Sequence, residues 1–324
     1  MENWKEAKKH FSRLGLMFFL GTLIVFAVQL GTTALVQAIN PTLFENVDIS
    51  LVLSMLPMYL VGMPIMIGLI KRVPGTKPQQ HKLGAGQLLT VFCISYAIMF
   101  VGNLIGQLIT LGIGLIKAQP VSDVIVDLVQ TLNPLTAFFI MALCAPVIEE
   151  FVFRKLLIDR TIRYGQAAAV LLSGLMFGLF HGNLNQFAYA FLLGAFWGFV
   201  YVKTGRLLYT IVPHMVINFM GSVVSLLLLE NPLAQMDYTD MQSAAGLLSQ
   251  NGLSFVVSAL YVVFVLSLVS AGIALFFVNL SKFRLGPGEV VIPKGKRFSA
   301  VILNVGMVLY ILFWIIQIVL QLLG

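Results

Sequence analysis

The chain has 324 residues, of which 59% are hydrophobic and only 10% are charged, and its formal net charge is +7 at neutral pH. A water-soluble protein of this length could not bury so much apolar surface, so the composition excludes a soluble globular fold and favours a protein of the lipid bilayer. A positive net charge can also indicate a nucleic-acid partner, but the distribution of the charges argues against one.

Apolar stretches of nearly the length that an α-helix needs to cross a bilayer, about 20 residues, occur throughout the chain. In chain order they are 14–39, 49–70, 86–116, 134–158, 166–182, 184–202, 207–229, 253–280 and 298–322. We therefore predict an all-α, polytopic membrane helix bundle with about nine transmembrane helices. The chain then divides into an N-terminal three-span region at 1–129, a four-span core at 130–230 and a C-terminal two-span region at 231–324.

The charged residues are distributed unevenly between the predicted loops. Lys and Arg gather in the segments 5–13, 71–82, 154–163, 203–206 and 282–297, which this span count places on one side of the membrane. The other side carries the acidic residues Glu45, Asp48, Asp123, Asp127, Glu230, Asp237 and Asp240, with Lys117 as a basic exception. Basic loops usually remain in the cytoplasm. We therefore predict a multi-pass protein of the cell membrane with a cytoplasmic N-terminus, in contact with membrane lipid and without a nucleic-acid partner.

Pairs of glycines four residues apart occur on three of the predicted spans. They are Gly102/Gly106, Gly174/Gly178 and Gly194/Gly198. Small residues at this spacing let two helix backbones approach closely in lipid. Because the pairs lie on three different spans, we predict close packing within one bundle. Dimerisation is the alternative, and the oligomeric state stays open.

Polar, chemically active side chains form three short clusters inside the hydrophobic spans. The clusters are Glu149-Glu150-x-x-x-Arg154, Phe177-x-x-x-His181 and His214-x-x-x-Asn218. Ionisable groups in a membrane span are energetically costly, so they are rare and usually functional. The other two histidines, His10 and His81, lie in basic segments. The three clusters are therefore the candidate functional site.

A count along the chain predicts that Glu149 and His181 lie at the same depth. Spans four and five should form an antiparallel hairpin with its turn at Tyr164-Gly165, sixteen residues from each of them. At 1.5 Å per residue, both lie roughly 24 Å from the tip of the hairpin. Arg160, near the tip, is expected to protrude into the cytoplasm, which reduces the depth in lipid. We therefore predict that the active site faces the cytoplasmic side.

Two pairs of residues in the clusters are four positions apart and thus share a helix face. Glu150 and Arg154 are predicted to form an ion pair, which leaves Glu149 free for another role. His214 and Asn218 lie on one face of the seventh span, which follows a predicted turn near Thr204-Gly205. Counted from this turn, they lie at a depth compatible with the same pocket.

These residue types predict the hydrolysis of an amide bond. A carboxylate beside an imidazole can deprotonate a water molecule, and a second imidazole with an amide can donate hydrogen bonds to the oxyanion that forms. Glu149, His181 and His214 could instead bind Zn²⁺, with a water molecule in the fourth, open position. The residues alone do not decide between water activation without a metal and water activation by zinc. A proton-coupled transporter or a non-catalytic scaffold is the alternative function, because a Glu/His set also suits a proton relay.

The three clusters, in this order on successive hydrophobic helices, resemble the CAAX protease and bacteriocin-processing (Abi) family of intramembrane endopeptidases, which is related to the type II CAAX prenyl endopeptidase. The resemblance covers about residues 130–230. It implies that Glu149 is the catalytic carboxylate and that His181 is its partner in activating water. It also implies that His214 and Asn218 stabilise the oxyanion, or bind the metal in a metalloprotease.

The resemblance also implies roles for supporting residues and for a substrate. Glu150 and Arg154 would organise the site, and Phe177 belongs to the second motif. The substrate would be a membrane-associated or lipidated peptide or protein, and immunity to a bacteriocin is a non-catalytic alternative. Because the family mechanism is described both as metal-dependent and as glutamate-dependent, zinc stays open, and we favour water activation without obligatory zinc.

Overall fold

The computed structural model describes residues 3–229 and 252–323, and within these ranges it contains helices and no β-strand. Eight helical stretches there are long and apolar enough to cross a membrane, and α9 (Gln166–Phe180) is a shorter apolar helix. The predicted all-α bundle is therefore confirmed, although one of the expected spans is too short to cross a bilayer alone. The expected outer residues Glu230, Asp237 and Asp240 and the C-terminal Gly324 lie outside the described ranges.

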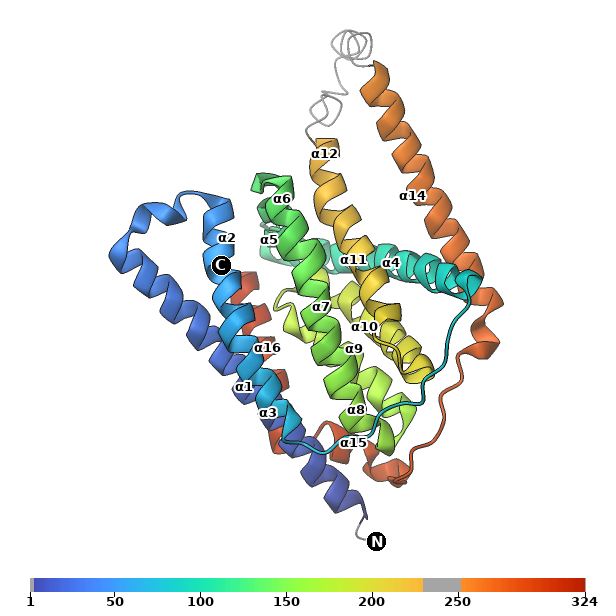
Figure 1. Cartoon of the computed structure of the whole chain (residues 1–324). Helices are drawn as coiled ribbons and strands as arrows, with labels where there is room; N and C mark the ends of the chain where they lie inside the picture. The colour runs from blue at the N-terminus through green and yellow to red at the C-terminus, as the bar shows by residue number, and fades with distance from the viewer. Residues whose placement is uncertain (1–2, 230–251, 324) are drawn as a thin grey trace.

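The first and last long helices lie side by side. α1 (Asn3–Ile39) packs against α16 (Val305–Leu323) and against α3 (Met63–Lys71), and together they form the left-hand part of the molecule (Figure 1). α2 (Val47–Pro57) continues into α3 through the π-helical turn η2 (Met58–Gly62). Pro57 explains this turn, because proline has no N–H group to donate to the preceding helical turn.

The last predicted span, 298–322, is interrupted near its start. α15 (Arg297–Val301) ends before α16 begins. In the break, the side-chain oxygen of Asn304 accepts a hydrogen bond of 3.0 Å from the N–H group of Met307. Such a cap satisfies one of the N–H groups that have no partner in the first turn of a helix.

Three long helices form the part of the bundle around α4 (Ala85–Lys117), which packs against both α10 (Leu184–Thr204) and α14 (Gly252–Val278). α10 also packs along its length against α9. α9 and α10 thereby connect the N-terminal half of the chain to the core that carries the polar clusters.

The fourth span is one continuous helical rod that contains two π-helical segments. Its segments are α6 (Pro134–Thr136), η3 (Ala137–Cys144), α7 (Ala145–Glu150), η4 (Phe151–Leu156) and α8 (Leu157–Thr161), where η3 and η4 are π-helical. Pro146 lies in the first turn of α7, directly after the first π-helical segment. π-helical turns are rare and frequently lie at functional sites. Here they enclose the turn that carries Glu149 and Glu150.

The remaining described elements are shorter. They are η1 (Pro41–Phe44), α5 (Val124–Thr131), η5 (Ile162–Tyr164), α11 (Leu208–Phe219), the π-helical η6 (Met220–Val224), α12 (Ser225–Leu229), η8 (Leu280–Lys282) and η9 (Lys294–Lys296). The two predicted hairpin turns are confirmed at Gly165, with φ of 123°, and at Gly205, with φ of 59°. Glycine adopts such positive φ angles without the steric cost of a side chain.

The glycine pairs lie where helices of the same chain approach closely. A Cβ atom on Gly102 would be 2.5 Å from the Cα of Tyr189, so α4 and α10 touch there through their backbones. A Cβ atom on Gly174 would be 2.7 Å from the carbonyl oxygen of Phe191, which brings α9 equally close to α10. The predicted packing within one bundle is therefore confirmed.

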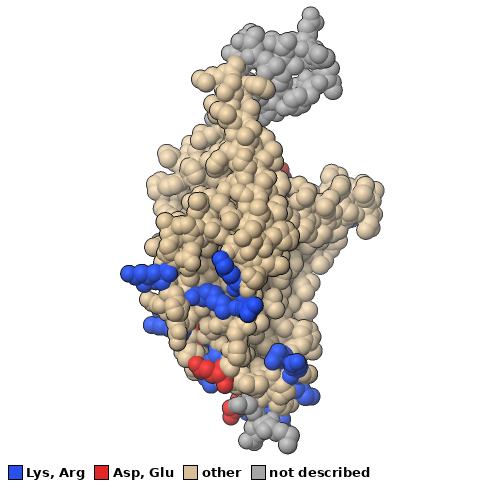
Figure 2. Space-filling model, turned by 90° about the vertical axis from the view of Figure 1, so that its right-hand side faces the viewer, with Lys and Arg blue, Asp and Glu red and all other residues tan. Residues whose placement is uncertain are grey.

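Basic side chains gather at one end of the bundle. On the face shown in Figure 2, Lys and Arg lie over the lower half, toward the N-terminus, and the upper half is almost free of them.

Arg160 is an exception to the prediction that the basic residues of the α8–α9 hairpin protrude. Its side chain is buried, and its Nε donates a 2.8 Å hydrogen bond to the carbonyl oxygen of Ile70 in the last turn of α3. Carbonyl groups at a helix C-terminus lack partners within the helix, which explains why the arginine is drawn inward.

Candidate active site

The four residues predicted to be catalytic all line one cavity. The cavity has a volume of 560 Å³, and Glu149, His181, His214 and Asn218 contribute to its wall from α7, from the C-terminal end of α9 and from α11. Phe177 of α9 lines it as well. The fold therefore brings the three sequence clusters together from three separate helices.

Glu150 and Arg154 form the ion pair that their spacing predicted. Arg154 Nη2 lies 3.0 Å from Glu150 Oε1, and both side chains are fully buried. The same guanidinium donates from Nη1 to the hydroxyl of Ser173, and its central carbon lies 4.4 Å from the centre of the Phe177 ring. A cation above an aromatic face is stabilised by the ring's charge distribution. Arg154 is thus held behind the cavity wall.

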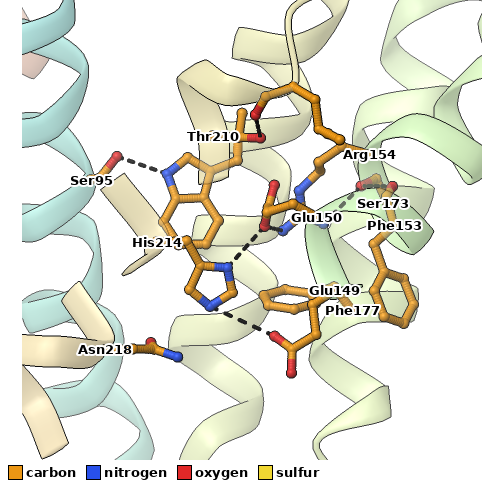
Figure 3. A network of polar contacts seen from close by, with 12 residues as sticks. Ser95, Glu149, Glu150, Phe153, Arg154, Ser173, Phe177, Thr210, His214 and Asn218 are labelled. Carbon is orange, nitrogen blue, oxygen red and sulfur yellow. Dashed lines mark hydrogen bonds and ion pairs between the residues drawn. The ribbon is translucent and has the colours of Figure 1, made fainter. Parts of the chain in front are cut away.

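His214 connects the two neighbouring carboxylates. Its Nδ1 lies 3.1 Å from Oε1 of Glu150, and its Nε2 lies 3.6 Å from Oε2 of Glu149 (Figure 3). Because the Glu150 carboxylate is paired with Arg154, it acts as an acceptor, and Nδ1 of His214 donates to it. The other ring nitrogen, Nε2, is then the one that can exchange a proton with Glu149 in the cavity.

Trp197 of α10 belongs to this cluster, although the sequence analysis did not select it. Its ring lies over the His214 ring at 4.6 Å between centroids and 31° between planes. Its indole N–H donates a 2.9 Å hydrogen bond to the hydroxyl of Ser95 on α4. Indole N–H groups usually have a partner when they are buried. The sequence does place a tryptophan inside one predicted span and a serine inside another, and a buried indole N–H needs such a partner.

His181 forms its hydrogen bond within its own helix. Its Nδ1 lies 2.9 Å from the backbone carbonyl oxygen of Phe177. A carbonyl oxygen can only accept, so Nδ1 carries the hydrogen and Nε2 is left with a free lone pair. Within the described residues, the ion-pair partner of Glu149 is His214, and His181 shares only the cavity with Glu149.

Asn218 has one of its amide hydrogens engaged. Its Nδ2 donates a 2.9 Å hydrogen bond to the carbonyl oxygen of Met141, which lies in the π-helical segment η3. In a π-helix the pattern of backbone bonding changes, which leaves carbonyl groups available for side chains. The contact fixes the amide at the cavity wall and leaves its second hydrogen for another acceptor.

The three side chains considered as zinc ligands, Glu149, His181 and His214, are not gathered around one point in this arrangement. Among the described residues, no group of three or more His, Cys, Asp or Glu side chains is placed to hold a metal ion together. We therefore derive no step of the chemistry through a metal.

The cavity extends from the polar cluster away from the basic loops. Its outer wall includes Asp123 and Val126 at α5, the short helix after α4, whereas the buried Arg154 lies one turn closer to the basic hairpin tip. The sequence predicts a site that faces the basic, cytoplasmic side, partly because Arg160 is expected to protrude. The side chain of Arg160 is instead buried against the end of α3, and α5 helps to line the cavity that contains Glu149.

Comparison with known proteins confirms the predicted resemblance. Residues 131–220 match the family model described as type II CAAX prenyl endopeptidase Rce1-like, and this segment contains all three clusters. A protein of Bacillus subtilis (strain 168) named "Putative membrane peptidase YdiL" is 27% identical over 126 residues, which cover 39% of this chain. The aligned region is 50% of that relative, so the chain spans about half of its length. No solved structure gives a significant match. The matched family supports an intramembrane peptidase of the CAAX type in general terms.

Proposed function

We propose that this protein is an intramembrane endopeptidase that hydrolyses a peptide bond of a membrane-associated or lipidated protein or peptide. The observation that carries the proposal is the Glu149–His214 pair in a cavity that His181 and Asn218 also line. A carboxylate and imidazoles around one cavity inside a membrane protein suit general acid–base catalysis.

In the proposed mechanism, Glu149 and His181 activate a water molecule. Glu149 removes a proton as the water oxygen attacks the carbonyl carbon of the substrate, and Nε2 of His181 accepts the other water hydrogen and so orients the nucleophile. The tetrahedral intermediate then collapses: the C–N bond breaks, and the proton held by Glu149 passes to the departing nitrogen. The products are a carboxylic acid and an amine, and the acid then passes its proton to the amine or to solvent.

His214 and Asn218 supply the charge stabilisation in this proposal. With His214 protonated, the two carboxylates Glu149 and Glu150 are balanced by His214 and Arg154, so the buried group carries no net charge. The Nε2–H of His214 and the second amide hydrogen of Asn218 can then donate to the oxyanion. Glu150 holds the imidazole by Nδ1, in the way that a carboxylate orients a catalytic histidine in other hydrolases.

We further propose that the site is reached from the side opposite the cytoplasm. The basic loops indicate a cytoplasmic end of the bundle, and the cavity extends away from that end toward Asp123 and Val126. Substrate segments that leave the bilayer on the outer side would then meet Glu149 without crossing the membrane core. This proposal differs from the cytoplasmic orientation that the sequence predicts.

The test uses purified protein in proteoliposomes with a library of internally quenched peptides that have a hydrophobic C-terminal half. We expect cleavage by the wild type and by the control Glu45→Gln, whose residue lies outside the cavity, and no cleavage by Glu149→Gln. A pH-driven flux without cleavage would support the proton-coupled transporter instead. If neither cleavage nor flux is observed, and a cellular phenotype of the protein persists in Glu149→Gln, the result would support a scaffold or immunity protein.

A further inference from the structure

A line of polar side chains runs along the cavity from the end of α9 into α10. Nδ2 of Asn183 donates to the backbone oxygen of His181 at 3.0 Å and to Oε1 of Gln186 at 2.8 Å. Nε2 of Gln186 in turn donates to the hydroxyl of Tyr189 at 2.7 Å. The three residues are spaced by three positions, so they lie along one side of the first turns of the helix.

The direction of these bonds fixes what Tyr189 can still do. The amide nitrogen of Gln186 is only a donor, so the Tyr189 oxygen is the acceptor and its own hydrogen remains free. Each bond in such a chain polarises the next one, which strengthens the phenol as a donor. Tyr189 lines the cavity, and its ring stands at 6.3 Å and 72° from the ring of His181. The cavity therefore has a preoriented donor beside His181.

Asn185, one helical turn before Tyr189, offers the complementary group. It lines the same cavity, is only 8% exposed, and its Oδ1 is buried without a hydrogen-bond partner among the described residues. A buried carbonyl oxygen without a partner is destabilising, so it indicates a group that is satisfied when a ligand is bound. The backbone oxygen of Asn185 is also where a Cβ on Gly106 would collide, which fixes this turn of α10 against α4.

We propose that Tyr189 and Asn185 bind the main chain of the substrate, one residue of which is held in an extended conformation beside the scissile bond. In an extended chain the N–H and C=O groups of one residue point to the same side, as they do in a hydrogen-bonded β pair. Tyr189 donates to that carbonyl group, and Asn185 accepts from that N–H group. Asn185 and Tyr189 are four positions apart on α10 and therefore share one face of the helix, so both side chains can reach the same short segment of substrate.

This proposal rests on the proposed function and adds a requirement on the substrate. A transmembrane helix uses its own N–H and C=O groups in intrahelical bonds, so a helical segment presents none to the cavity wall. The substrate must therefore be unwound or naturally extended at the cleavage point. Because the contacts are to the main chain, they select conformation, and the identity of the substrate side chains matters less there.

The test compares a cleavable library peptide with copies that are N-methylated at successive positions next to the scissile bond. N-methylation at the position read by Asn185 should lower kcat/KM about tenfold in the wild type, the size expected for one hydrogen bond. Asn185→Leu should lower it by a similar factor for the parent peptide and should have no further effect on that N-methylated copy. Tyr189→Phe should also lose about tenfold, whereas Tyr209→Phe, whose hydroxyl bonds Leu83 outside the cavity, should not.

A purely structural role predicts a different pattern, since Asn185→Leu would then harm the parent and all methylated peptides equally. That result would overturn the proposal. Binding of the same peptides to the Glu149→Gln protein in nanodiscs provides the measurement that does not depend on cleavage. Suppose that the wild type cleaves the peptide, that Glu149→Gln does not, and that the parent and methylated peptides bind equally well. That result contradicts the main-chain contacts and leaves the proposed hydrolysis intact. Suppose instead that no peptide is cleaved, but that the wild type binds the parent peptide tightly and one N-methyl group weakens this binding in the wild type and not in Asn185→Leu. That result contradicts the proposed hydrolysis and leaves the main-chain contacts intact.

Discussion

Nε2 of His214 lies 3.6 Å from the carboxylate of Glu149, while Nδ1 of the same ring is held by Glu150 at 3.1 Å. This arrangement gives two adjacent carboxylates different surroundings. Glu149 lines the cavity, and Glu150 is fully buried against Arg154. We therefore expect substitution of Glu149 to affect activity and substitution of Glu150 to affect stability.

Glu149→Gln should remove hydrolysis and leave the fold intact. The amide keeps the shape of the carboxylate but cannot accept the proton of the attacking water, and a general base contributes about 10²–10⁴-fold to the rate. Glu150→Gln should instead lower the stability, because Arg154 loses the anion that compensates it in a buried place. The measurements are kcat/KM and thermal stability of both variants in the same detergent. Full activity of Glu149→Gln would contradict the catalytic assignment.

Arg154→Ala should be strongly destabilising. It leaves Glu150 without its cation, and breaking a buried ion pair from one side costs about 3–5 kcal/mol. The matched control is Lys155→Ala, the next residue, whose ion pair with Asp159 is partly exposed and should contribute no more than about 1 kcal/mol. The yield and the unfolding midpoint of the two variants are compared. An Arg154→Ala protein that is inactive but as stable as the control would show that Arg154 contacts the substrate instead.

Contacts within one helix could be predicted from the sequence. Glu150 and Arg154 are four positions apart, and the regular geometry of a helix places them on one face, as the 3.0 Å ion pair confirms. The hairpin turns at Gly165 and Gly205 were also predictable, because glycine there permits positive φ angles. In these cases the local chain determines the geometry.

Contacts between helices could not be predicted in the same way. Counting residues from the hairpin tip predicts that Glu149 and His181 lie at the same depth, and both line one cavity, but the ion-pair contact of Glu149 is with His214 on α11. A count along a regular α-helix gives the depth of a residue and not its contact on another helix, and η4 winds the fourth span differently between Glu149 and the hairpin tip. A π-helical turn changes which face a following residue occupies. The rotation of α11 about its axis is likewise set by packing, and so the stacking of Trp197 on His214 was not predicted.

Trp197→Leu should reduce activity more than stability. The leucine still fills part of the space, but it removes the flat ring that fixes the orientation of His214 and the hydrogen bond to Ser95. We expect a decrease in kcat of about tenfold or more, because small displacements of catalytic groups are costly. Ser95→Ala is the comparison, since it removes only the partner of the indole. Equal kcat values for Trp197→Leu and the wild type would exclude this orienting role.

The glycine contacts predict that alanine substitutions at two positions of α4 differ in their effect on stability. Gly102→Ala should destabilise the protein, because its Cβ would be 2.5 Å from the Cα of Tyr189, and α10 would have to move away. Gly112→Ala on the same helix is the control, since its Cβ would meet nothing within 4 Å. Overpacking costs about 1–3 kcal/mol, whereas the control should be neutral or slightly stabilising. The thermal unfolding midpoint distinguishes them, and equal midpoints would contradict close packing of α4 on α10.

The side of the membrane from which the cavity is reached can be tested by labelling single cysteines in intact cells. Val126→Cys and Lys77→Cys are made in a background with Cys93→Ser and Cys144→Ser, which removes both native thiols. Val126 is 47% exposed and lines the cavity at α5, and Lys77 is exposed in the basic segment between α3 and α4.

A membrane-impermeant maleimide added to intact cells should label Val126→Cys and should reach Lys77→Cys only after the membrane is permeabilised. The physical reason is the distribution of charge: the basic segments stay in the cytoplasm, and α5 lies well above α8 and α15 in the view of Figure 1, away from the basic lower end. Asp123→Cys should behave like Val126→Cys, while Lys203→Cys and Lys294→Cys should behave like Lys77→Cys. If Lys77→Cys is labelled in intact cells and Val126→Cys is protected, the orientation is reversed and the cavity faces the cytoplasm.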